Sequence, residues 1–479
     1  MASTSNITSG FIDLATFDEI ERYLYGGDSA TAYFVRETRK STWFTQVPVI
    51  LSNASGQAAF GNEWSVSISR AGDYLLQTWL RVGLPQVKQT GAGENEGIRW
   101  TRNLMHNLIK DCSITFNDLV AARFDNFHLD FWSAFTVPAS KQNGYNQMIG
   151  NTAALTTLVT GNNALPPSVA GDNGVTYLNL PLPFFYSRDS GVALPTAALP
   201  YNEMRIQFSF RNWNELLIKE QLTSPSTAEY RQSLTASNLD GGAPVLKDVQ
   251  VWANYAIVSN DERKRMACAP RDILIEQVQT ANKQTFQPAT QNSPMYDLRL
   301  SHAIKVLFFA VQNTTWASEH SNYTVSSPGS GVAPMGGKFS NNYSVDPIQQ
   351  TTLVYENTNR LGAMGSDYFS LVNPYYCAPN IPEVTGLHVY SYSLDFICLD
   401  PMGSTNYGKL TNVSIMPKAS TLAVAANGTN GIAAASTADG VGFKQTYQFV
   451  LTAVDNNIIR VSGGALGFPF ITFLAPGLI

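Results

Sequence analysis

Apolar and polar residues alternate along much of the chain after Thr42. At residues 64–70 and 204–211 the alternation is strict, which is typical of strands buried on one face. Looser forms of the pattern predict strands at residues 73–82, 112–116, 176–180 and 249–257. The best helix candidates in this half are residues 103–110 and 125–134. The first half of the chain is therefore predicted to be a β-sandwich.

A second strand-rich half follows. Residues 273–280 alternate loosely, and residues 304–311 are nearly all apolar, as in a strand covered on both faces. Residues 390–398 alternate again. Asp455, Asn456 and Asn457 lie between two apolar runs at 447–454 and 458–461. Because Asp and Asn tolerate the positive φ of a tight turn, we predict a hairpin here.

The densest charge cluster of the chain, at residues 259–265, separates the two halves. Asp261 and Glu262 offset its basic residues, which favours a solvated helical turn over a basic binding patch. The 479 residues also exceed the ~250–300 at which single cores stop growing. We therefore predict an arm at residues 1–42, a first β-domain at 43–258, a linker at 259–272 and a second β-domain at 273–479.

The arm is predicted to contain one short amphipathic helix. Thr16 and Glu19 have the spacing of a capping box, and Gly26-Gly27 would end the helix. The residues expected on its apolar face are Leu14, Phe17, Ile20 and Leu24. So short a helix needs a partner to be stable. Two alternatives stay open: this face packs on its own domain, or it binds another protein.

Long polar segments interrupt both halves, at residues 87–97, 157–175, 219–242, 313–345 and 416–442. Segments of this length are uncommon in compact domains and often functional. We interpret them as surface loops on a rigid scaffold. Many short strands with a few long insertions suit a jelly roll, although periodicity leaves the strand order open.

Composition favours a protein that hides much of its surface. Only 14% of residues are charged and 44% are hydrophobic, which suits extensive contacts with neighbouring subunits, or a secreted β-protein with a Ser/Thr/Asn surface. The net charge is -5 without a Lys/Arg-rich block, so direct nucleic-acid binding is not expected. The polar first ten residues predict no signal peptide. No apolar run is long enough to predict a transmembrane helix.

The sequence contains no motif typical of a catalytic, metal-binding or phosphate-binding site. The five histidines form no HExxH motif, and the four cysteines fit neither a zinc pattern nor a disulfide framework. The segment 331–338 lacks the Ser or Thr that follows the lysine of a phosphate loop, and no GxSxG elbow is present. We therefore predict no catalytic residue, no metal ligand and no cofactor.

Several segments together resemble one family, the major capsid proteins of iridoviruses. They are ITSGFIDLAT at 7–16, YFVRETRKSTWF at 33–44, SVSISRAGDY at 65–74 and RWTRNLMHNLI at 99–109. PLPFFYSRD at 181–189 is similar to a segment found more widely in capsid proteins of large DNA viruses. DERKRM at 261–266 and DPMGSTNYGKL at 400–410 match motifs of the second half. The resemblance spans nearly the whole chain in order and departs mainly at 313–345 and 416–442.

The resemblance implies an all-β protein with two tandem eight-stranded jelly-roll sandwiches. It also implies a homotrimer with a pseudo-hexagonal outline, which contacts neighbouring capsomers and minor capsid proteins. These capsomers would tile an icosahedral shell around an internal lipid membrane and the DNA, after assembly in the host cytoplasm. The alternatives are a virion spike or receptor-binding protein, a carbohydrate-active enzyme with tandem jelly rolls, and a lectin-like module.

Overall fold

The computed structural model describes residues 5–93, 96–166, 175–221, 231–232, 234–315, 318–325, 345–428 and 444–470. The chain divides into two units, Met1–Trp43 and Phe44–Ile479. We call the first unit the arm and the second the body, and describe each by itself.

The arm contains two helices, α1 (Ser5–Ala15) and α2 (Glu19–Tyr25). The predicted capping box of Thr16 and Glu19 is wrong. Asp18 precedes α2, and the Glu21 carboxylate accepts a hydrogen bond from the Asp18 N–H at 3.2 Å. The Thr16 hydroxyl instead donates to the Asp13 carbonyl at 2.6 Å, which closes the end of α1. The predicted end of the helix at Gly26 is confirmed.

Two antiparallel sheets form the first half of the body, with orders β1-β15-β4-β11 and β2-β3-β12-β7-β8. Their bounds are β1 (Phe44–Ile50), β2 (Ser52–Gly56), β3 (Glu63–Ser67), β4 (Tyr74–Pro85), β7 (Ile109–Phe116), β8 (Leu119–Asp125), β11 (Val175–Pro181), β12 (Met204–Phe210) and β15 (Lys247–Val258). The alternation predicted along β3, β4 and β12 is confirmed, because their apolar residues fill the core between the sheets.

The second half repeats this arrangement with the orders β16-β25-β19-β22 and β18-β24-β20-β21. Its strands are β16 (Arg271–Thr280), β17 (Gln284–Phe286), β18 (Tyr296–Asp297), β19 (Ala303–Asn313), β20 (Ile348–Tyr355), β21 (Thr358–Gly365), β22 (His388–Ser391), β23 (Thr405–Asn406), β24 (Val413–Ala419), β25 (Tyr447–Ser462) and β26 (Ala465–Gly467). In each half, the first strand of the main sheets pairs with the long strand near the end of that half, β1 with β15 and β16 with β25.

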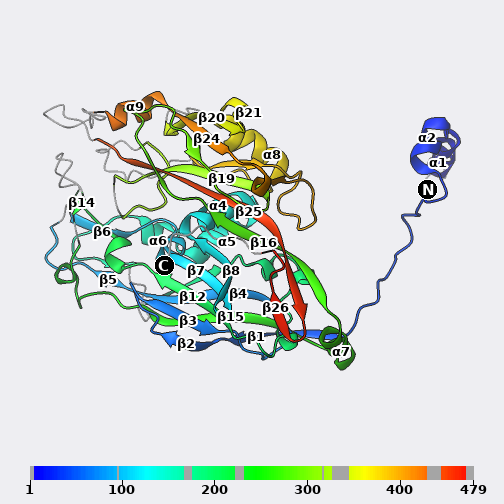
Figure 1. Ribbon diagram of the computed structural model, residues 1–479, viewed down its shortest axis with the longest axis horizontal. Helices are drawn as coiled ribbons and strands as arrows, with labels where there is room; N and C mark the ends of the chain where they lie inside the picture. The colour runs from blue at the N-terminus through cyan, green and yellow to red at the C-terminus, as the bar shows by residue number, and fades with distance from the viewer. Residues whose placement is uncertain are drawn as a thin grey trace. The chain divides into compact units, whose positions relative to one another are not determined.

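Helices and turns connect the strands. They are α3 (Leu104–Leu108), α4 (Asn126–Thr136), α5 (Ala139–Ile149), α6 (Ala153–Thr156), η1 (Phe185–Ser187), η2 (Ser190–Val192), η3 (Thr196–Ala198), η4 (Trp213–Glu215), η5 (Ala236–Asn238), α7 (Asn260–Cys268), η7 (Tyr368–Val372), α8 (Asn373–Cys377), η8 (Tyr407–Lys409) and α9 (Thr421–Asn427). The helices predicted near 103, 125 and 259 are thus confirmed. Figure 1 shows α4 between the strands of the first half and those of the second.

The predicted hairpin at Asp455–Asn457 is wrong, because β25 runs through this segment without a turn. Asp455 pairs with Gln277 on β16, and on the other side with Ile304 on β19. Neighbours on both sides satisfy the backbone, which keeps the strand extended despite its turn-forming residues.

The predicted strand at 390–398 is also too long, since β22 ends at Ser391. There the Ser391 hydroxyl donates to the Ser393 carbonyl at 2.7 Å, and the Ser393 hydroxyl donates to the Asp395 carbonyl at 3.0 Å. Local side-chain bonds of this kind compete with strand pairing.

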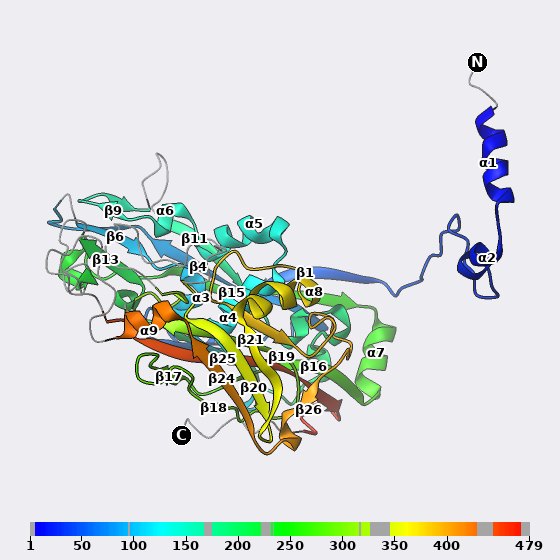
Figure 2. The ribbon, with the colours of Figure 1, turned by 90° about the horizontal axis from the view of Figure 1, so that it is seen from above.

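Three of the predicted loops contain strands. They are β5 (Val87–Lys88), β6 (Glu96–Trp100), β9 (Val159–Thr160), β10 (Ala164–Leu165), β13 (Leu217–Gln221) and β14 (Arg231–Gln232). These strands form the sheets β14-β13-β6-β9 and β10-β5, and β6, β9 and β13 lie together at one end of the body (Figure 2). The other two predicted surface loops are also partly wrong. The segment 416–442 begins inside β24 and contains α9, and the described residues 318–325 are mostly buried. Within these two loops, the segments 316–317, 326–344 and 429–442 lie outside the described residues.

Candidate assembly surfaces

The four residues predicted to bind a partner all lie exposed on the arm, with exposed fractions between 52% and 73%. The structure does not bring them onto one helix. Leu14 lies at the end of α1, Phe17 lies between the helices, and Ile20 and Leu24 lie one turn apart on α2.

Sequence reasoning missed α1, whose Ile7, Phe11 and Ile12 are also exposed. The spacing of Ile7, Phe11 and Leu14, four and then three residues, is a signal that could have identified it. The arm therefore presents more apolar surface than was predicted.

The junction between the two halves of the body has an apolar centre. Phe127, Phe131 and Phe135 of α4 pack against β19, β22 and β25 in one buried cluster. The Phe308 ring of β19 lies 5.9 Å from Phe131 and 5.6 Å from Phe135, both in stacked orientation. A helix of the first half thus covers the outer face of a sheet of the second half.

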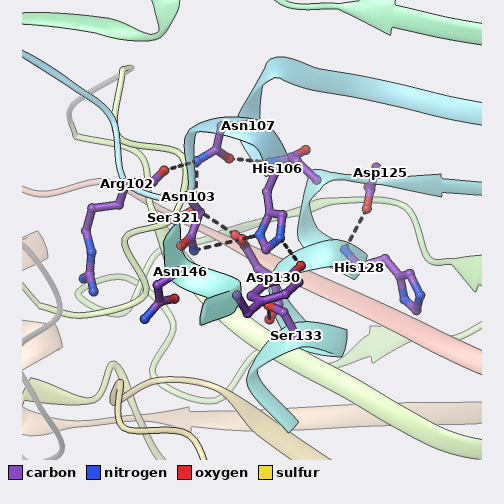
Figure 3. A network of polar contacts seen from close by, with 12 residues as sticks. Arg102, Asn103, His106, Asn107, Asp125, His128, Asp130, Ser133, Asn146 and Ser321 are labelled. Carbon is purple, nitrogen blue, oxygen red and sulfur yellow. Dashed lines mark hydrogen bonds and ion pairs between the residues drawn. The ribbon is translucent and has the colours of Figure 1, made fainter. Parts of the chain in front are cut away.

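Beside this cluster, Asp130 is the hub of a buried polar network (Figure 3). One carboxylate oxygen lies 2.8 Å from His106 Nδ1 and 3.1 Å from Asn103 Nδ2. The other oxygen accepts hydrogen bonds from Ser321 Oγ at 2.8 Å and from the Tyr323 hydroxyl at 2.7 Å. One carboxylate therefore ties the first half to a segment almost two hundred positions further along the chain.

The hydrogen bonds from Asp130 through His106 to Tyr145 connect the residues as in a catalytic relay, but they do not end at an activated nucleophile. His106 Nε2 lies 2.7 Å from the Tyr145 hydroxyl. Burial, followed by the Asp130 charge, raises the pKa of Tyr145. Burial also raises the pKa of Tyr323 well above its ordinary value. Both phenols stay neutral donors and poor nucleophiles, so the network stabilises the junction.

Two other histidines are structural as well. His128 lies among aromatic rings, 5.9 Å from Trp132, and its burial lowers its pKa to about 3, so it is neutral. His388 Nε2 lies 2.8 Å from the buried Asp346 carboxylate. Among the described residues, no group of three or more His, Cys, Asp or Glu could hold a metal ion.

Buried ion pairs complete the junction. Arg99 of β6 pairs with Glu220 of β13 at 2.8 Å and with Glu319 of the second half. Lys305 of β19 pairs with Glu276 of β16 at 2.5 Å, and its Nζ also donates to the Cys398 carbonyl at 2.7 Å.

First-half residues reach the second ion pair too. Arg188 Nε lies 3.4 Å from the second oxygen of Glu276, and the guanidinium stacks 3.6 Å from the Trp132 ring. Because a buried charge is costly without a partner, these pairs fix the register of the two halves.

Replacing Tyr323 with phenylalanine should lower the free energy of unfolding by about 2 kcal/mol, since it removes a buried donor to a carboxylate. Urea denaturation of the purified protein measures the change. Tyr177→Phe is the matched control, because the Tyr177 hydroxyl donates to Asp248 at 3.0 Å on the surface and its loss should have little effect. Equal effects of the two substitutions would contradict a role for Asp130 as a hub.

Fold comparison identifies the class of protein. The chain matches the crystal structure of PBCV-1 VP54 fitted into a cryo-EM reconstruction of the virophage Sputnik. The TM-score is 0.70 at 20% identity, over 92% of this chain and 100% of that chain. The body is thus a mainly β protein of several antiparallel sheets with the fold of the double jelly-roll capsid proteins.

Sequence comparison then identifies the family. Residues 32–258 match the family described as major capsid protein N-terminus, and residues 262–467 match the large eukaryotic DNA virus major capsid protein. The major capsid protein of Costelytra zealandica iridescent virus is 64% identical over 98% of this chain and 99% of that protein. That of Tipula iridescent virus is 64% identical over 96% and 97%. The chain belongs to the iridovirus family of major capsid proteins.

The predicted family, its structural role in the virion shell and its lack of enzymatic function are therefore confirmed. The alternatives of a spike protein, a carbohydrate-active enzyme and a lectin-like module are therefore excluded. Within the described residues, no helix is long and apolar enough to cross a membrane.

Proposed function

We propose that three copies of this chain form a capsomer with a pseudo-hexagonal outline. The observation that supports the proposal is the strand order that the two halves share once the edge strand β2 of the first half and the additional strands β17, β23 and β26 of the second half are set aside. Each half then has eight strands in its two main sheets, and the first, last, third and sixth of them lie in one sheet. Each half is then an eight-stranded jelly roll, at residues 43–258 and 273–479, joined by a linker at 259–272. Three chains supply six similar barrels, and a ring of three closes through one repeated head-to-tail interface.

These capsomers tile an icosahedral shell that encloses a lipid membrane and the DNA genome, assembled in the host cytoplasm. The body does not bind nucleic acid directly, in agreement with the net charge of -5. The arm extends the contacts of the capsomer. Its exposed Leu14, Phe17, Ile20 and Leu24 bind minor capsid proteins or lie near the membrane.

Deleting residues 1–27 should leave trimers intact and block shell assembly, because the body keeps its own core while the apolar arm is lost. Native mass spectrometry measures the trimer, and electron microscopy of cells that express the shell proteins measures assembly. The control is Glu19→Gln with Arg22→Gln, which removes an exposed ion pair of α2 and keeps the apolar residues. Normal shells from the deletion variant would contradict the role of the arm.

A further inference from the structure

The junction inside one chain shows how one half of the body can cover the other. On β19, Leu307, Phe309 and Val311 face the core of the second half. Val306, Phe308 and Ala310 alternate with them and lie under α4. The helix that follows β8 in the first half therefore covers the outer face of the sheet β16-β25-β19-β22.

The second half has a helical segment in the same topological place. Phe369 and Pro374 bury one side of this segment, whereas its other apolar residues are exposed. Just as α4 follows β8, η7 and α8 follow β21, which is also the edge strand of its sheet. Val372, Tyr375 and Tyr376 are three and four positions apart, which places them on one side of a helix. Tyr375 and Tyr376 are 70% and 76% exposed, with their rings 5.2 Å apart. We call these three residues the tyrosine ridge.

The first half has the matching sheet face, and it is aromatic. In the sheet β1-β15-β4-β11, Leu80 and Val82 of β4 face the core, so Trp79 and Arg81 face outward. Trp79 pairs with Trp252 of β15, and their rings stack at 6.3 Å with an interplanar angle of 7°.

Two exposed apolar residues extend this face. Ile50 pairs with Trp252 and is 46% exposed. Tyr177 is 44% exposed, and the Arg81 guanidinium lies 4.2 Å from its ring. We call Ile50, Trp79, Arg81, Tyr177 and Trp252 the tryptophan face.

The two surfaces belong to opposite parts of the body. Figure 1 shows α8 in its upper part and β4 and β15 in its lower part. One copy cannot bring them together, whereas two copies placed head to tail can. Tyr, Trp and Arg, which make up most of these two surfaces, are also the residue types that contribute most to protein interfaces.

We propose that the tyrosine ridge of one copy docks on the tryptophan face of the next copy. This inference rests on the self-assembly proposed above and names the surfaces that carry it. Three copies then contain six comparable junctions, in which α4 covers a sheet inside each chain and α8 covers the corresponding sheet of the neighbour. The interface is heterologous, so each copy contributes a different surface to each of its two neighbours.

Two variants of the full-length chain test the proposal. The ridge variant carries Tyr375→Asp and Tyr376→Asp, and the face variant carries Ile50→Asp and Tyr177→Asp. Each alone should weaken self-association at least about tenfold, since buried aromatic anchors contribute more than 1.4 kcal/mol each. The control, Leu119→Asp, changes an exposed apolar residue of β8 and should leave the trimer unchanged. Circular dichroism and thermal unfolding check that every variant is folded.

Mixing the two variants gives the decisive result. The ridge variant keeps its tryptophan face, and the face variant keeps its tyrosine ridge, so these two surfaces can still bind each other. The mixture should therefore form 1:1 heterodimers, which native mass spectrometry detects. A mixture that stays monomeric, or single variants that still form trimers, would overturn the assigned surfaces. If the wild-type chain forms trimers in the same experiment, the capsomer proposal still holds. A wild-type chain that stays monomeric would overturn both.

Discussion

Replacing Lys305 with methionine is expected to lower the free energy of unfolding by about 3–5 kcal/mol, the usual cost of removing one partner from a buried ion pair. Lys305 and Glu276 are both buried, with Nζ and Oε1 2.5 Å apart. Among the described residues, the substitution leaves Glu276 with the more distant Arg188 as its ion-pair partner, at 3.4 Å. Urea denaturation of the purified protein measures the loss.

The matched control is Arg460→Met, which breaks a well-formed pair with Asp272 at 2.7 Å on the surface. Exposed pairs are screened by solvent and contribute little, so its unfolding curve should nearly coincide with the wild type. If Lys305→Met behaved like Arg460→Met, the buried ion pairs would not be what stabilises the junction.

Replacing Asp455 with asparagine is expected to stabilise the protein by several kcal/mol near pH 8. Asp455 is fully buried in β25, and the nearby Gln279 side chain offsets only part of the cost of burying its charge. Burial, followed by the charge of Glu276, raises the pKa of Asp455 to about 8. The folded protein therefore keeps this carboxyl protonated at neutral pH, whereas the unfolded chain ionises it near pH 4.

The sign of the pH dependence follows from this difference. A group with a raised pKa stabilises the fold most below its unfolded pKa, and that stability is lost as the pH rises through the folded value. The gain from Asp455→Asn should thus grow by about 1.4 kcal/mol per pH unit between about pH 4 and pH 8, and stay constant above. Denaturation of both proteins from pH 5 to pH 9 measures the difference, and a gain independent of pH would contradict the raised pKa.

The sequence predicted the strands well where burial alone decides the pattern. β12 alternates because one face meets the core, whereas β19 is apolar from Val306 to Val311 because α4 covers its other face. The sequence-based prediction was wrong at Asp455, where turn-forming residues lie in a central strand. Local preference could not reveal the two neighbouring strands, β16 and β19, that hold β25 extended.

The assembly surfaces were harder to predict, because they depend on distant parts of the chain. Ser321 meets Asp130 across 191 positions, and no local pattern marks such a contact. Trp79 and Trp252 come together only through the pairing of β4 with β15. The apolar residues of the arm were recognisable from their spacing, but their division between two helices depends on Asp18 as the cap of α2.

Three copies of this chain are expected to close into one capsomer. Native mass spectrometry of the purified protein, combined with negative-stain imaging of the same sample, tests it most directly. We expect a particle with three times the chain mass of 52.3 kDa and a pseudo-hexagonal outline. Monodisperse 52.3 kDa monomers at high protein concentration would contradict it.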